Sequence, residues 1–228
     1  MDFLIQELIP FNGYKMKQDL QKILAFLSFA ERLKFELRHS WLSNGRQESV
    51  AEHVWRTSLM AVLLYPYLEQ SLDMAKTLKM IIIHDIVEAE AGDVPVFEAE
   101  TPEAKKKKQE KEKCAIENIK TMLNSSSGDE IYELWFEFEE KRTLEAKFAQ
   151  ALDKLEAQIQ HNEADIKTWL PPEKLRIFFK LDNYCVFHSS LIQFKELIQE
   201  QTFNKLRAAQ MDIEQLKQEA LHIDKPRK

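Results

Sequence analysis

Apolar residues recur at intervals of three and four along most of the chain, which is the spacing of one face of an α-helix. In the first such stretch, residues 16–37, the apolar positions are Leu20, Ile23, Leu24, Leu27 and Leu33. No stretch alternates apolar and polar residues as a half-buried strand does, and the chain contains no internal repeat. The pattern predicts an all-α fold.

Capping residues set the boundaries of several predicted helices. Ser49 and Glu52 form a capping-box sequence, Asp73 is an N-cap before an apolar run, and Thr101-Pro102 combines an N-cap with a proline at the first helical position. The helices are predicted over residues 16–37, 49–64, 73–83, 101–123, about 129–141, 144–161, 172–188 and 190–222. We expect loops at residues 89–100 and 124–128.

Composition excludes several classes of protein. The four glycines lie too far apart for G-x-G-x-x-G or a Walker loop, and G-x-S-x-G is absent. The net charge of −6 argues against binding to a nucleic acid polymer. The lysine run at residues 105–108 lies among glutamates on a predicted helix, where a solvated face explains it.

The two cysteines and the absence of targeting signals indicate in which cellular compartment the protein is expected. Cys114 and Cys185 match no zinc or redox motif, so we interpret them as reduced thiols. The N-terminal residues do not resemble a signal peptide, and no apolar stretch approaches membrane-spanning length. We expect a soluble, cytoplasmic protein that does not bind membranes.

The pair His84-Asp85 is the strongest chemical signal. It closes the apolar run at residues 80–83, and Glu88 follows one helical turn later. An imidazole and a carboxylate are costly to bury unless they are paired, and a divalent metal binds both. The alternative is a core histidine that bonds to a backbone carbonyl.

Two further titratable residues lie on apolar helical faces. His53 lies near Val50 and Val54, and Asp153 interrupts an apolar run in the helix predicted at residues 144–161. Each has an ordinary explanation by itself, for example an ion pair between Asp153 and a neighbouring lysine. Four such groups on three helices favour a metal site, because metal sites in helical bundles are assembled in this way.

These residues carry a resemblance to a known family. His53, His84-Asp85 and Asp153 are similar to the H…HD…D signature of the HD-domain metal-dependent phosphohydrolases. Residues 46–53, RQESVAEH, resemble the R-x-E-[SN]-V-[AS]-[DE]-H segment of the 5′-deoxynucleotidase subfamily. Residues 84–95, HDIVEAEAGDVP, resemble its H-D-x-x-E-x-x-x-G-D-[IVL]-P block.

The resemblance spans roughly residues 20–165 and implies an HD-domain helical core over residues 1–190. Residues 191–228 have no counterpart and are expected to form a charged helical extension. The implied metal ligands are His53, His84, Asp85 and Asp153. The implied catalytic residues are Glu88 and Asp93, and the implied substrate contacts are Arg38, Trp41 and Arg46.

The substrate contacts leave alternatives open. The subfamily often has tryptophan directly after the arginine, whereas Trp41 lies three residues after Arg38. Trp41 therefore either fills the same wall of the pocket from a shifted position or packs in the core. Arg38 and Arg46 can hold a phosphate with forked hydrogen bonds, or they form surface ion pairs, for instance with Glu48.

The function that the resemblance implies is hydrolysis of deoxyribonucleoside 5′-monophosphates to nucleoside and phosphate. One divalent metal ion is expected, and these ligands suit Mn, Co, Fe, Zn or Ni. The alternatives are an HD phosphohydrolase for another nucleotide or phosphorylated metabolite, and a non-catalytic helical interaction module. Glu88 and Asp93 argue against the module, because a purely structural metal needs neither.

Members of this family commonly form dimers, so the resemblance also implies a homodimer. The aromatic-rich stretch Trp135, Phe136 and Phe138 is one candidate surface, and core packing is the alternative for the same residues.

Overall fold

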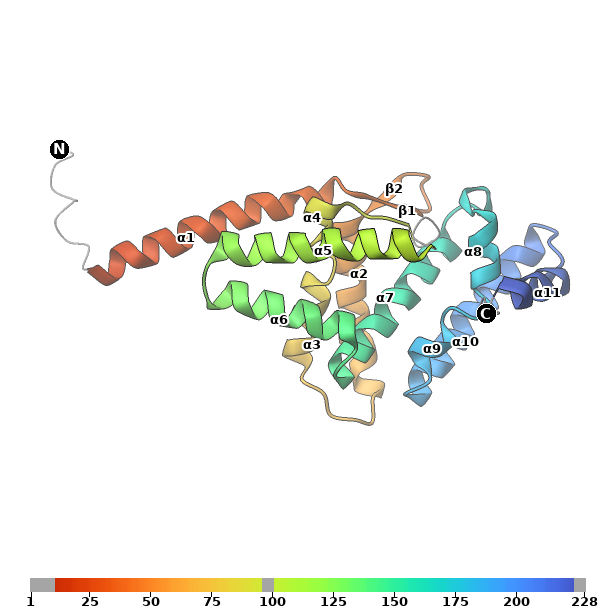
Figure 1. Cartoon of the computed structure of the whole chain (residues 1–228). Helices are drawn as coiled ribbons and strands as arrows, with labels where there is room; N and C mark the ends of the chain where they lie inside the picture. Colours follow the sequence, from red (N-terminus) through yellow and green to blue (C-terminus); the bar gives the residue numbers. More distant parts are fainter. Residues whose placement is uncertain (1–10, 96–100, 224–228) are drawn as a thin grey trace.

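The predicted all-α class is confirmed by the computed structural model, which describes residues 11–95 and 101–223 (Figure 1). The longer helices are α1 (Phe11–Ala30), α2 (Val50–Leu64), α3 (Met74–Ile83), α5 (Pro102–Leu123), α6 (Ser126–Glu140), α7 (Leu144–Glu163), α10 (Ser189–Ala208) and α11 (Ile213–Ile223). The shorter elements are η1 (Glu31–Lys34), η2 (Tyr65–Tyr67), α4 (Glu88–Ala91), η3 (Ile166–Thr168), α8 (Pro171–Arg176) and α9 (Asp182–Cys185). Strands β1 (Leu37–Trp41) and β2 (Gln47–Ser49) form a small antiparallel sheet. Within these ranges no helix is long and apolar enough to cross a membrane.

Three predicted helix starts are confirmed together with their caps. The Ser49 hydroxyl accepts a hydrogen bond from the Glu52 amide at 3.4 Å, and the Glu52 carboxylate accepts one from the Ser49 amide at 2.9 Å. Asp73 caps α3 and Thr101 caps α5 through their side chains. The capping box fixes where α2 begins, and so it places His53 in the first turn of that helix.

The prediction of a helix through residue 37 is wrong, because the chain leaves α1 at Ala30 and soon enters a β-hairpin. Strand β1 pairs with β2, with Trp41 opposite Gln47. Gly45 lies in the connecting turn with a φ of +86°, which glycine adopts without strain. Strand β1 also contacts α7, so tertiary packing overrides the local apolar spacing.

The loop expected at residues 124–128 is shorter than predicted, because α6 already begins at Ser126. Asn124 ends α5 in the left-handed conformation, with a φ of 41°. A Cβ on Gly128 would lie 3.0 Å from the Lys120 carbonyl oxygen. The missing side chain therefore lets α5 and α6 pack closely, which explains a glycine inside a helix.

The C-terminal helices are interrupted where the sequence pattern predicts continuous ones. Residues 172–188 fold as α8, a series of turns and α9, and residues 190–222 fold as α10 and α11. Gln210, with a φ of 58°, lies between the last two helices. Helix α10 packs on α7, and Leu191 and Ile198 belong to the main apolar cluster. The division of the chain near residue 190 stays a prediction.

Helix α7 lies at the centre of the core, with α2, α3, α6 and α10 packed around it (Figure 1). Its completely buried apolar residues are Ala146, Phe148, Ala149, Ala151, Leu152 and Leu155. A second apolar cluster joins α5 to η1, α4 and the start of α2. Trp135 and Phe138 are only 3% and 4% exposed, so these two aromatic residues pack in the core.

Candidate active site

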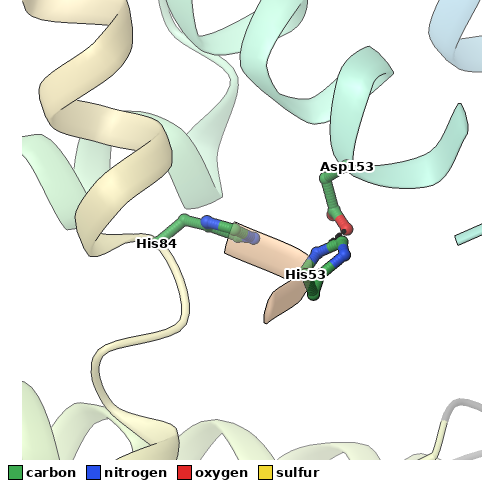
Figure 2. Close-up of side chains that lie close together, drawn as sticks. All are labelled: His53, His84 and Asp153. Carbon is green, nitrogen blue, oxygen red and sulfur yellow. Dashed lines mark ion pairs between the residues drawn. The ribbon is translucent and has the colours of Figure 1, made fainter. Parts of the chain in front are cut away.

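Three helices bring the first candidate ligands together. His53 comes from the first turn of α2, His84 ends α3, and Asp153 lies midway along α7. One ligand atom from each side chain lies within 4.8 Å of the others, and all three residues are buried. Figure 2 shows the three side chains pointing toward one another, with Asp153 Oδ1 3.2 Å from His53 Nε2.

Asp85 adds a fourth group to this cluster. Its Oδ2 lies 3.0 Å from His84 Nε2 and 3.7 Å from His53 Nε2. The structure therefore gathers the four residues that the sequence pattern indicates as ligands: His53 and Asp153 lie within α2 and α7, His84 ends α3, and Asp85 lies in the turn that follows. His84 and Asp85 are adjacent residues, yet their side chains converge because the chain turns directly after α3.

Hydrogen bonds on the far side of each imidazole fix its orientation. His84 Nδ1 donates to the Ile81 carbonyl at 2.7 Å, and His53 Nδ1 bonds to the Glu156 carboxylate. Because a carbonyl can only accept, His84 carries its proton on Nδ1, and a bond to carboxylate favours the same tautomer for His53. Both Nε2 atoms are buried without a hydrogen-bond partner. Two such nitrogens beside two carboxylates fit a divalent cation.

The charges around the imidazoles support this fit. Burial and Arg38 lower the pKa of His53, but Glu156 and Asp153 outweigh them and raise this pKa to about 9. Burial alone raises the pKa of Asp153, yet Lys154, His53 and His84 hold it well below its ordinary value. The negative charges of Glu156 and Asp153 therefore stabilise a positive charge near His53. A proton on His53 or a bound metal ion supplies this charge.

Glu156 is a component of the site that the sequence reasoning missed. It is completely buried on α7, one turn after Asp153, so the two carboxylates reach opposite nitrogens of the same imidazole. Arg38 and Arg56 also pair with Glu156, at 3.4 Å and 2.7 Å. One feature of the sequence could have indicated Glu156: it lies three positions after Asp153, on the same, otherwise apolar face of the helix.

A cavity of about 390 Å³ opens beside the four-residue cluster. The side chains that line this cavity include Arg38, His39, Asp85, Glu88, Asp93, Lys108, Lys141, Asp153, Lys154, Arg176, Lys180 and Tyr184. They come from β1, the segment after α3, and helices α5 to α9. Polar and charged side chains dominate the lining, as expected for a site that binds a charged ligand.

Glu88 and Asp93 lie on one wall of this cavity. The chain from His84 to Glu88 does not continue α3 as an α-helix, because bonds between residues three apart replace the α-helical pattern, as from the Glu88 amide to the Asp85 carbonyl. Glu88 nevertheless faces the cavity, with Oε2 buried and without a hydrogen-bond partner. Gly92 has a φ of +78°, a conformation that turns the chain and delivers Asp93.

The electrostatics of this wall favour protonated carboxyl groups. Burial, followed by the charges of Asp85 and Asp93, raises the pKa of Glu88 well above its ordinary value. Burial also raises the pKa of Asp93, although Arg38 opposes the change. Two neighbouring carboxyl groups with raised pKa values hold a proton more readily than free carboxyl groups do, which favours a role in general acid catalysis.

The three expected substrate contacts lie in different places. Arg38 lines the cavity, and its Nη1 also pairs with Glu48 at 2.8 Å. Trp41 does not line it but stacks edge-on against His39, with ring centroids 4.7 Å apart, and His39 faces the cavity in its place. Arg46 is exposed and pairs with Glu52 at 2.6 Å, away from the cavity lining.

Comparison with known proteins agrees with these observations. A family model described as HD domain matches residues 30–186. The 5′-deoxynucleotidase HDDC2 of Xenopus laevis is 28% identical, over 79% of this chain and 88% of the relative. The 5′-deoxynucleotidase hdd1 of Schizosaccharomyces pombe is 32% identical, over 64% of this chain and 73% of the relative. A structure described as a predicted metal-dependent phosphohydrolase from Magnetospirillum magnetotacticum is similar with a TM-score of 0.73 and 28% identity, over 90% and 99% of the two chains.

Proposed function

Because the chain belongs to the HD-domain family, we propose that it is a metal-dependent 5′-nucleotidase that hydrolyses deoxyribonucleoside 5′-monophosphates to nucleoside and phosphate. The observation that carries the proposal is the convergence of two histidines and two aspartates beside a cavity that also holds Glu88 and Asp93. The names of the relatives support the substrate class, since several of them are 5′-deoxynucleotidases.

His53, His84, Asp85 and Asp153 are the residues that hold the metal in this proposal. The ion supplies positive charge that polarises a phosphoryl group and acidifies water. Neutral imidazole and carboxylate ligands suit Mn, Co, Fe, Zn or Ni, and the availability of each metal contributes to the choice. Glu156 and the Ile81 carbonyl keep both imidazoles in the orientation that binding requires.

Glu88 and Asp93 act on protons during hydrolysis. A water oxygen forms a bond to phosphorus and loses one proton, the bond between phosphorus and the nucleoside 5′-oxygen breaks, and that oxygen gains a proton to leave as a hydroxyl. Glu88 donates this proton, because burial raises its pKa well above the ordinary value and so favours the acid form. Asp93 raises the pKa of Glu88 and shares the proton with it. The proton lost by the water replaces the one that the carboxyl pair donates.

Arg38 binds the substrate from the β1 wall. Its guanidinium remains charged, and the ion pairs with Glu48 and Glu156 use Nη1, so they fix the group at the edge of the cavity. His39 lies in the wall where the related subfamily often has tryptophan, with Trp41 packed behind it. Arg46 is left out of the proposed contacts because it lies outside the cavity.

The test is release of phosphate by purified protein with each divalent metal added in turn. Deoxyribonucleoside monophosphates are compared with the corresponding ribonucleotides and with other phosphorylated metabolites. We expect the deoxy compounds to give the highest kcat/KM. Preference for another phosphoester would favour a different HD phosphohydrolase, and no release from any compound would favour the non-catalytic interaction module.

The protein is further proposed to form a homodimer with two-fold symmetry, the commonest closed assembly. Apolar residues that are unusually exposed follow one stripe on α1 and another on α2: Met16, Leu20, Leu24 and Leu27, and Trp55, Leu59, Val62 and Leu63. Such stripes on a water-facing surface are typical of interfaces. Sedimentation at micromolar concentration tests the proposal, with Leu24→Glu and Leu63→Glu expected to dissociate the dimer and Lys17→Glu as control. A wild-type protein found only at 26.9 kDa would reject it.

A cytoplasmic location is also proposed, and the two free cysteines support it, since a reducing compartment keeps thiols unpaired. Fractionation of cells with a tagged chain tests this location, and recovery in a secreted or membrane fraction would contradict it.

A further inference from the structure

The lining of the cavity includes several cations besides Arg38. Lys154 on α7 lies 2.6 Å from Asp153, and so it lies next to the candidate metal centre. Lys141, at the end of α6, places its Nζ 4.8 Å from the centre of the Tyr184 ring and is exposed at the rim. Another lysine of this lining, Lys180, lies in the turns between α8 and α9.

Lys180 differs from Lys108 and Lys154, two other lysines of the cavity, in its partners. Lys108 pairs with Glu112 and Lys154 pairs with Asp153. Among residues 11–95 and 101–223, no carboxylate forms an ion pair with Lys180, although its side chain is partly buried against the cavity. A lysine that faces a cavity without a counter-charge is available for an anionic ligand.

The electrostatic surroundings make this position unfavourable without such a ligand. Burial and the charge of Lys154 lower the pKa of Lys180 to about 8, Arg176 and Arg38 act in the same direction, and Asp153 opposes them. Positive charges therefore surround the ammonium group. A bound anion would relieve this repulsion and would stabilise the protonated lysine.

We propose that Lys180 is a phosphate-binding residue, whose ammonium group donates to a phosphoryl oxygen of the substrate. The inference rests on the proposed function, in which the anionic group of the substrate is its phosphate. Phosphate must lie beside the metal ligands for hydrolysis, and Lys180 is close enough to Asp153 and Lys154 to feel both charges. Arg38 and Lys154 already have carboxylate partners, so Lys180 contributes charge that the protein itself does not neutralise.

The binding of inorganic phosphate to metal-loaded protein, measured by calorimetry, tests this role without depending on turnover. Lys180→Met keeps the apolar stem but removes the charge, Lys180→Arg restores a cation, and Lys174→Ala on α8 is the control because it lies outside the cavity lining. We expect Lys180→Met to weaken phosphate binding by about 10- to 100-fold, the range for a hydrogen bond between charged groups. Lys180→Arg should recover most of the affinity, and Lys174→Ala should match the wild type.

Metal content and thermal stability separate this contact from a structural role. Lys180→Met should keep its metal, and its phosphate-free form should melt at or above the wild-type temperature, because a repelled charge has been removed. Wild-type phosphate affinity in Lys180→Met would overturn the proposal, as would loss of metal from that variant. Equal weakening by Lys174→Ala would overturn it too, since general surface charge would then explain the effect.

The dependence on pH gives an independent measurement. Because the pKa of Lys180 is about 8 without ligand, the wild-type protein should lose phosphate affinity as the pH rises above this value. Lys180→Arg should keep its affinity over the same range, and identical profiles would contradict the role of Lys180. Failure of the proposed function has a different outcome: the wild type would release no phosphate from any nucleotide, whatever the affinity for inorganic phosphate.

Discussion

Glu156 provides the sharpest test of how the fold prepares the candidate metal centre. This completely buried carboxylate bonds to His53 Nδ1 and pairs with Arg38 and Arg56. If it orients the imidazole, its loss must weaken metal binding although it is not itself a proposed ligand. The variants are Glu156→Gln, which keeps the size and one acceptor oxygen, and Glu156→Ala, which removes every contact.

The magnitude follows from the contacts that each variant loses. Loss of a partner behind a metal-ligating histidine typically lowers metal affinity by about 10- to 100-fold, or about 1.4 to 2.8 kcal/mol. Glu156→Gln can still accept from Nδ1, so we expect the lower end, and Glu156→Ala should reach the upper end. The alanine variant also leaves two arginines without their shared carboxylate, which costs about 3 kcal/mol of folding free energy.

The assay is competition for metal against a chromophoric chelator, combined with thermal unfolding of the metal-free protein. Glu163→Gln is the matched control, because Glu163 lies on the same helix and pairs with Arg56 at 2.6 Å but has no contact with His53. Its metal affinity should equal that of the wild type. If Glu156→Ala also binds metal like the wild type, the bond to Nδ1 does not orient His53 and the reasoning is refuted.

Three further outcomes are expected. His84→Ala should abolish metal binding, since it removes a proposed ligand, and elemental analysis of protein purified without chelator should fall from about one metal per chain to none. Glu88→Ala should retain metal and KM but lose kcat by about 10²- to 10⁴-fold; loss of metal would make Glu88 a ligand, and near-normal kcat would transfer the proton role to Asp93. Phe148→Ala, at a completely buried position of α7, should lower the free energy of unfolding by about 3 to 5 kcal/mol in denaturant titrations, and a change below about 1 kcal/mol would contradict the packing described above.

Local sequence signals predicted the parts of the fold that local chemistry determines. Helix starts at Ser49, Asp73 and Thr101 depend on side chains that bond to backbone amides three residues away, so the sequence contains the whole interaction. Helix ends were predicted less well. The chain leaves α1 at Ala30 because β1 pairs with β2 and contacts α7, and these partners are distant in sequence.

The same distinction separates the candidate ligands from the residues around them. The candidate histidine and aspartate ligands could be recognised in the sequence, because charged groups on apolar helix faces are costly to bury unless they have a partner. Glu156 and Lys180 gave weaker signals, since acidic residues and lysines are common on helices and turns. Their surroundings, an imidazole from α2 for one and a lysine from α7 for the other, exist only after the helices pack.

The site divides into a part built on packed helices and a part built on connecting segments. The ligand cluster rests on α2, α3 and α7, which form the apolar core, so its geometry is fixed by the same packing that stabilises the fold. Four wall residues that are proposed to act on the substrate lie outside the long helices: Arg38 on β1, Glu88 and Asp93 around α4, and Lys180 between α8 and α9. The candidate metal centre and these four groups therefore depend on different parts of the fold.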